Sequence, residues 1–218
     1  MRQPLGFSSP TPQVTTFLII IIATYLAFAL LGHNEWGGLL YHALLLDPDK
    51  VIHSYQIWRL GTYGMLHDTS SPMHVIFNAL MLYMVGPQLE DYFGETKFFI
   101  LIVLSLILGG VLVCAAYILG ISYAIVVGFS AATMGLIIAW GLTFKDSIMY
   151  IFGIVPLSGI QLVYVSVGLE ILYAVSANSI SSAAHFGGMF AGFLVAFDLY
   201  KPSGFSRLKR ILAKKRLR

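Results

Sequence analysis

Residues 98–119 read FFILIVLSLILGGVLVCAAYIL, and this stretch of 22 residues contains no charged side chain. A helix needs about 20 predominantly apolar residues to cross a lipid bilayer. The chain of 218 residues is 58% hydrophobic and 11% charged, whereas soluble domains are about a quarter charged. The stretch and the composition together predict a helical membrane protein with one compact domain.

Further apolar segments on both sides of this stretch bring the predicted number of membrane spans to six. The predicted spans are 14–31, 73–85, 98–119, a segment within 121–144, 160–175 and 183–199. Two other apolar pieces are too short to cross. The piece 37–46 is expected to lie in the interface or to re-enter the membrane, and 148–157 ends at Pro156 and Gly159, which interrupt helices. If 148–157 crossed, the count would be seven, and the serine and histidine discussed below would face opposite sides.

The basic residues predict the orientation. Eight of the thirteen Lys and Arg residues lie in the segment 201–218, whereas the loop 32–72 has only Lys50 and Arg59 against four acidic residues. Basic segments favour the cytoplasm, so six spans place both termini there. We expect a membrane domain over 1–200 and a basic cytoplasmic tail that contacts lipid headgroups rather than nucleic acid. The expected location is a bacterial inner membrane.

Spans two, four and six run in the same direction, and each has polar residues near its outer end. His74 and Asn78 share one face of the second span because they are four residues apart. Ser130 follows Gly128 at the start of the fourth span, and His185 lies near the start of the sixth. Taken singly, each fits a helix cap or interhelical packing. Polar groups in a membrane are costly without partners, so the shared depth favours one common site.

A serine and a histidine at the same depth suit nucleophilic catalysis. The serine hydroxyl is a weak nucleophile until a base removes its proton, and a neutral imidazole does this at physiological pH. The resulting oxyanion needs donors, which the Ser130 N–H, Asn78 and His74 can supply. No aspartate lies at this depth to orient His185, so the residues predict a dyad rather than a triad.

Glycines near His185 predict how the spans meet. Gly188 and Gly192 follow the histidine by three and seven residues and form a small face below it. Ala131, Ala132 and Gly135 give the fourth span a similar face of small side chains near Ser130. Close packing of spans four and six is what a Ser130–His185 hydrogen bond requires.

Glu170 in the fifth span is expected to reach the interface or a water-filled cavity. An intramembrane carboxylate also fits a gate or a proton-transfer residue, so a transporter or channel that uses Glu170 stays an alternative. The chain shows no inverted repeat of the kind that many transporters have. The histidine spacing predicts no metal site, and no cofactor is implied.

Four segments, in this order along the chain, resemble motifs of the rhomboid family of intramembrane serine proteases. The resemblance covers about Trp58 to Tyr200. The matching segments are WR (58–59), HVIFN (74–78), GFSAATMG (128–135) and AHFGGMFAG (184–192).

The resemblance implies an all-α bundle of six transmembrane helices. It implies Ser130 as nucleophile, His185 as general base, and Asn78, His74 and the Ser130 amide as the oxyanion hole. The implied activity is hydrolysis of peptide bonds in or near transmembrane segments of other proteins, without metal or cofactor.

Two positions depart from the family pattern. Ala131 stands where the family commonly has glycine, and Met134 stands where many active members have a tyrosine that stacks on the catalytic histidine. A thioether can pack on an imidazole ring but holds it less firmly. A catalytically silent relative that binds transmembrane helices without cutting them is therefore a second interpretation.

Overall fold

The structure, a computed structural model, describes residues 9–31, 34–121, 123–151, 153–177 and 181–201. Helices dominate this part of the chain, with one short 3₁₀ turn (η1) and one hairpin. The elements are α1 (Pro12–Leu31), α2 (Glu35–Leu44), α3 (Pro48–His53), α4 (Arg59–Thr62), η1 (Tyr63–Met65), α5 (Pro72–Phe93), α6 (Glu95–Ile118), α7 (Ser130–Thr143), β1 (Ile148–Ile151), β2 (Val155–Ser158), α8 (Gly159–Ala177) and α9 (Ser181–Ala196).

Each of the six predicted spans corresponds to a helix: α1, α5, α6, α7, α8 and α9. Among the described residues, α1, α6 and α8 are long and apolar enough to cross a membrane, while α7 and α9 are shorter apolar helices. The second predicted span, 73–85, is too short, because α5 continues to Phe93. Glu90 and Asp91 lower the hydropathy near the end of α5, so the apolar pattern does not indicate this last part of the helix. The number of helices that cross stays a prediction.

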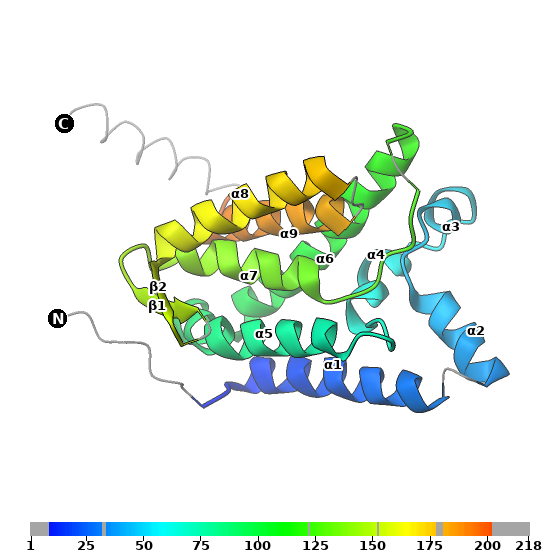
Figure 1. Cartoon of the computed structure of the whole chain (residues 1–218), viewed down its shortest axis with the longest axis horizontal. Coiled ribbons are helices and arrows are strands. Elements are labelled where there is room, and N and C mark those ends of the chain that lie inside the picture. The colour runs from blue at the N-terminus through cyan, green and yellow to red at the C-terminus, as the bar shows by residue number, and fades with distance from the viewer. Residues whose placement is uncertain (1–8, 32–33, 122, 152, 178–180, 202–218) are drawn as a thin grey trace.

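The long helices lie side by side, with different small elements at the two ends of the bundle (Figure 1). Helices α2, α3 and α4 gather at one end, where α5, α7 and α9 begin. The β1–β2 hairpin lies at the other end, where α1 begins and α9 ends. The polar residues near the starts of α5, α7 and α9 are therefore at one end of the bundle.

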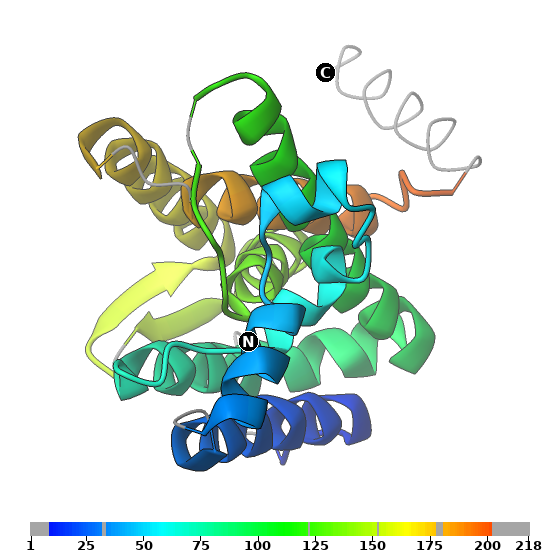
Figure 2. The same cartoon turned by 90° about the vertical axis from the view of Figure 1, so that its right-hand side faces the viewer.

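Helix α7 lies near the middle of the bundle, with α1 and α5 on one side and α8 and α9 on the other (Figure 2). Most of its side chains are buried, including the fully buried Trp140. Large apolar side chains instead face outward from α1 and α8, such as Leu30 and Val175, which are 78% and 79% exposed. Such surfaces are stable against lipid, where every backbone polar group is satisfied within a helix.

The apolar piece 148–157 forms most of an antiparallel hairpin rather than a helix. Ile148 pairs with Ser158 and Ile151 with Val155, and Gly153 takes a positive φ of 72° in the turn. This piece therefore adds no helix to the bundle among the described residues, and its failure to cross the membrane stays a prediction. The expectation of a purely all-α fold is wrong at this hairpin, because Pro156 and the β-branched residues favour an extended chain.

Side chains at the start of α4 hold the elements of the first loop together. The Arg59 guanidinium donates through Nη1 to His42 O at 2.7 Å and to Leu45 O at 2.5 Å. Trp58 Nε1 donates to Ala43 O at 3.0 Å. These acceptors lie at the end of α2, where carbonyl groups lack partners inside the helix. Trp58 and Arg59 thus donate hydrogen bonds to the carbonyl groups at the C-terminal end of α2 that have no partner inside the helix.

Candidate active site

Ser130 is the first residue of α7, and the backbone before it is unusual. Gly128 has a φ of 123°, which L side chains rarely adopt. A Cβ built on Gly128 would lie 2.6 Å from Cε1 of His74, so only glycine leaves room for that ring. The Gly128 N–H donates to Tyr63 O at 3.1 Å. Together these contacts end the preceding extended segment and start α7 at the serine.

Ser130 and His185 meet across the interface between α7 and α9. Ser130 Oγ lies 2.9 Å from Nε2 of His185. The His185 side chain is 15% exposed, so the pair is largely sheltered. The structure thus brings together the two residues for which the sequence predicts nucleophile and base, although they are 55 positions apart.

Glycines of α9 allow this close approach. A Cβ on Gly192 would lie 2.3 Å from Gly135 O on α7, and one on Gly187 would lie 2.4 Å from Leu108 O on α6. Real Cβ atoms do not come this close to a carbonyl oxygen. The sequence indicates a packing role for Gly188 and Gly192 but not for Gly187, which faces α6 instead of α7. Helix α9 therefore packs tightly on two helices at once.

Glu170 lies on the far side of the His185 ring from Ser130. Its Oε2 is 2.9 Å from His185 Nδ1, and the residue is 5% exposed. The expectation that Glu170 reaches the interface or an open cavity is wrong. The sequence has no aspartate at this depth, and the structure places a glutamate of α8 against the histidine instead.

Asn78 is buried beside the start of α7, and both ends of its amide have partners. Its Nδ2 lies 3.1 Å from His67 Nε2, and its Oδ1 accepts from Thr133 Oγ1 at 3.1 Å. An amide nitrogen carries two hydrogens, so one N–H stays available after the bond to His67. The neighbouring residues therefore fix the direction of this second N–H.

His67, which the sequence already places near the predicted site, is a site residue to which the sequence assigns no role. Its Nε2 also accepts the Phe129 N–H at 3.4 Å, so the ring acts as an acceptor at this nitrogen. Burial, with a further contribution from His74, lowers the pKa of His67 to about 4. The ring is thus neutral at physiological pH, and its Nε2 can accept hydrogen bonds from both Asn78 Nδ2 and the Phe129 N–H. The contact with His67 positions the Asn78 side chain. The spacing of histidines along the sequence gives no signal for a contact of this kind.

His74 completes the group from the start of α5. Its ring lies against Gly128 and makes an edge contact with His67, with 5.2 Å between ring centroids. The predicted oxyanion-hole residues His74 and Asn78 are thus brought to the segment that precedes α7. Among the described residues, no three His, Cys, Asp or Glu side chains lie close enough to hold a metal ion.

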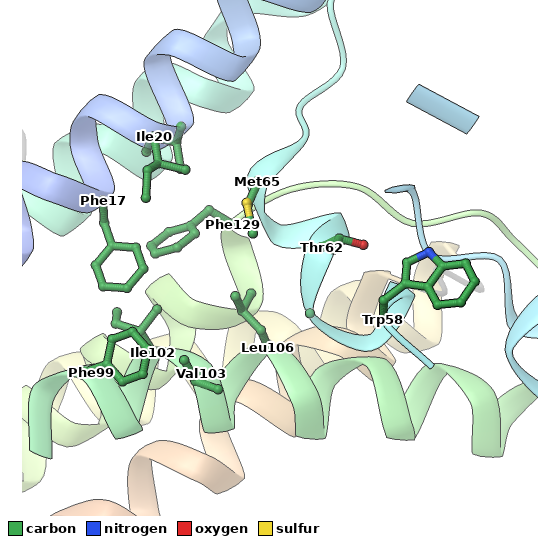
Figure 3. Close-up of a pocket in the computed structure, with 12 residues that line it drawn as sticks. Phe17, Ile20, Trp58, Thr62, Met65, Phe99, Ile102, Val103, Leu106 and Phe129 are labelled. Carbon is green, nitrogen blue, oxygen red and sulfur yellow. The ribbon is translucent and has the colours of Figure 1, made fainter. Parts of the chain in front are cut away.

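An apolar cavity of about 340 Å³ lies between α1, the first loop and α6 (Figure 3). Phe17 of α1 packs beside Phe129, the residue before Ser130, with ring centroids 5.8 Å apart. Ser130, His185 and Glu170 are not among the described residues that line it. The cavity is therefore a separate feature that touches the candidate site only through Phe129.

A family profile described as "Rhomboid domain" matches residues 54–202, which is more than half of the chain. The chain belongs to the rhomboid family. The matched region contains Ser130, His185, Glu170, Asn78 and His74, so the whole cluster lies inside the rhomboid domain.

Curated relatives carry rhomboid names as well. RHOMBOID-like protein 7 from Arabidopsis thaliana is 31% identical over 158 residues, which is 69% of this chain and 45% of the relative. Rhomboid protease GlpG from Photorhabdus laumondii is 26% identical over 196 residues, 85% of this chain and 60% of its own. RHOMBOID-like protein 1 from Arabidopsis is 31% identical over 154 residues, 70% of this chain and 37% of the relative. The chain thus spans about a third to three fifths of these relatives' lengths.

Proposed function

We propose that this rhomboid protein is an intramembrane serine endopeptidase that cleaves peptide bonds in or near transmembrane segments of other membrane proteins. The observation that carries the proposal is the 2.9 Å contact between Ser130 Oγ and His185 Nε2. A nucleophile and a base within hydrogen-bond reach form the minimal apparatus of covalent acyl transfer. The family membership and the resemblance to a protein named rhomboid protease support the same reaction.

In the first step, His185 Nε2 takes the Ser130 hydroxyl proton while Oγ attacks the scissile carbonyl carbon. The oxyanion that forms accepts hydrogen bonds from the Ser130 N–H, the second N–H of Asn78 and the His74 ring. The first N–H groups of α7 have no partners within the helix and favour negative charge. Loss of one such donor typically costs about 2.7–4 kcal/mol of transition-state stabilisation.

In the next steps, the imidazolium of His185 gives its proton to the leaving amine, and the C–N bond breaks. This leaves an ester between Ser130 and the substrate acyl group. His185 then takes a proton from water while the water oxygen attacks the ester carbonyl carbon. The Oγ–C bond breaks, His185 returns this proton to Ser130 Oγ, and the new carboxyl terminus leaves. No cofactor enters these steps.

In the proposed topology, α1, α5, α6, α7, α8 and α9 cross a bacterial inner membrane with both termini in the cytoplasm. The start of α1 and the end of α9 lie at the same end of the bundle. This supports the arrangement, because termini on the same side require an even number of crossings. The α2–α4 end, with the site beneath it, then faces outward. The exposed apolar side chains and the apolar cavity suit lipid chains as neighbours.

A catalytically silent rhomboid that only binds helices is the competing interpretation, because Ala131 and Met134 depart from the family pattern. The preserved Ser130–His185 contact favours the protease. A transporter built on Glu170 has less support, since that carboxylate is buried and bonded to His185.

The decisive experiment measures cleavage of a helical membrane substrate by purified protein in detergent. We expect Ser130→Ala and His185→Ala to abolish cleavage and labelling by a fluorophosphonate, while Ser54→Ala, in the exposed first loop, keeps both. Full cleavage by Ser130→Ala overturns the proposal, and a wild type that neither cleaves nor labels supports the silent relative.

Topology is tested by cysteine accessibility. Cys114 is the only cysteine in the chain, so a Cys114→Ala background allows single reporters. We expect a membrane-impermeant maleimide to label Thr69→Cys from outside the cell, and Ile154→Cys in the hairpin only after the membrane is opened. The reverse labelling contradicts the proposed orientation.

A further inference from the structure

Glu170 is an inward-facing carboxylate on a helix whose other large side chains mostly face outward. Its neighbours Leu169 and Ile171 are 61% and 50% exposed, whereas Glu170 is 5% exposed. A buried carboxylate is costly unless a specific partner compensates. Its partner is the Nδ1 atom of His185 at 2.9 Å, so α8 presents this charge to one ring nitrogen.

We propose that Glu170 is the positioning residue of a Ser130–His185–Glu170 triad. This inference rests on the proposed protease function and adds a third member to its dyad. Both ring nitrogens of His185 are engaged, Nδ1 by Glu170 Oε2 and Nε2 by Ser130 Oγ, each at 2.9 Å. The ring thus lies between the carboxylate and the hydroxyl.

The carboxylate selects the tautomer of the ring. An ionised glutamate only accepts hydrogen bonds, so Nδ1 carries the proton and donates it to Oε2. The lone pair is then on Nε2, which faces the Ser130 hydroxyl. Without this acceptor the proton is free to occupy Nε2, and a ring in that form cannot take the serine proton.

The same contact grows stronger as the reaction proceeds. The ring is neutral before attack and carries a full positive charge once Nε2 has taken the Ser130 proton. Interactions that are stronger in the transition state than in the ground state raise kcat. Glu170 stays ionised throughout, and the proton passes only between Oγ, Nε2 and the leaving amine.

Among the described residues, Glu170 is the hydrogen-bond partner that the structure shows for His185 Nδ1. Met134, one turn after Ser130, offers a thioether, which is only a weak acceptor. Ser182, one turn before His185, lies beside the Glu170 carboxylate and interacts with it. Glu95→Gln, at an exposed carboxylate at the start of α6, provides a control outside this cluster.

The kinetic test compares Glu170→Gln, Glu170→Asp and Glu95→Gln with wild type on a helical membrane substrate. A glutamine amide can donate to Nδ1 and thereby favours the wrong tautomer. We expect Glu170→Gln to lower kcat by about 10²- to 10⁴-fold with little change in KM. Glu170→Asp restores part of this loss, and Glu95→Gln stays within about threefold of wild type.

A second readout does not depend on activity. In ¹⁵N-histidine-labelled protein, the signal assigned to His185 by its absence in His185→Ala reports which nitrogen carries the proton. We expect Nδ1–H in wild type and Nε2–H in Glu170→Gln. Glu170→Gln with wild-type kcat, or Nε2–H in folded wild type, overturns the triad. A wild type that is inactive while His185 shows Nδ1–H overturns the protease proposal alone.

Discussion

Gly188 of α9 packs directly on the backbone of Ala131 in α7: a Cβ built on Gly188 would lie 1.9 Å from Ala131 O. Ala131 follows Ser130, and Gly188 lies one turn after His185. This contact therefore sets the distance between the two helices at the level of the serine and histidine. Backbone atoms on both sides leave little freedom to accommodate a larger residue.

Gly188→Ala is expected to separate α7 and α9 and to lengthen the Ser130–His185 contact. Overpacking of this kind costs about 1–3 kcal/mol, and a loss of catalytic geometry adds to it. Thermal unfolding in detergent and the rate of fluorophosphonate labelling measure the two effects. Gly168→Ala is the matched control, because a Cβ there meets nothing within 4 Å. Equal stability and labelling of both variants contradicts this prediction.

Glu90 of α5 caps the start of α1. Its Oε1 accepts the Gln13 N–H, and its Oε2 accepts the Val14 N–H, both at 3.0 Å, while Thr11 Oγ1 also donates to Oε2. Glu90→Gln leaves one acceptor oxygen for these donors. We expect a loss of about 1–3 kcal/mol in unfolding free energy. Asp91→Asn, which removes the same charge at the adjacent exposed position, should leave stability unchanged.

His67 predicts a pH dependence of stability. Its pKa is about 4 in the folded protein and about 6.5 in an unfolded chain, so the unfolded chain binds more protons between these values. The stabilisation is full above about pH 6.5 and is lost as the pH falls to 4, by at most about 3 kcal/mol. We expect His67→Gln to flatten this part of the pH–stability curve. His53→Gln, at an exposed histidine, serves as the control and should leave the shape of the pH–stability curve unchanged.

The hydrogen bonds of Arg59 are expected to hold the first loop in place more firmly than a lysine could. A lysine has no planar fork with which to reach His42 O, Leu45 O and the Gln56 side chain together. Arg59→Lys should speed hydrogen exchange in 35–53 while leaving that of α6 unchanged. Uniform acceleration throughout the protein would instead indicate a global loss of stability.

Hydropathy alone places the helices well because lipid demands long, apolar, hydrogen-bonded segments. It misses the end of α5, where Glu90 is buried by its contacts with the start of α1. It also cannot reveal the His67–Asn78 contact, since neither residue carries a spacing signal for the other. Contacts of this kind depend on which helix faces are turned toward each other.

The sequence by itself determined that this chain is a membrane helical bundle, and its pattern of apolar segments placed Ser130, His185, Asn78 and His74 near the starts of helices at one end of that bundle. Only the tertiary structure decided that Glu170 faces His185. The physical reason is that α8 is apolar on both its protein side and its outer side. Such a helix has no amphipathic stripe to reveal its inward face, so the direction of a single carboxylate is set by packing against α7 and α9.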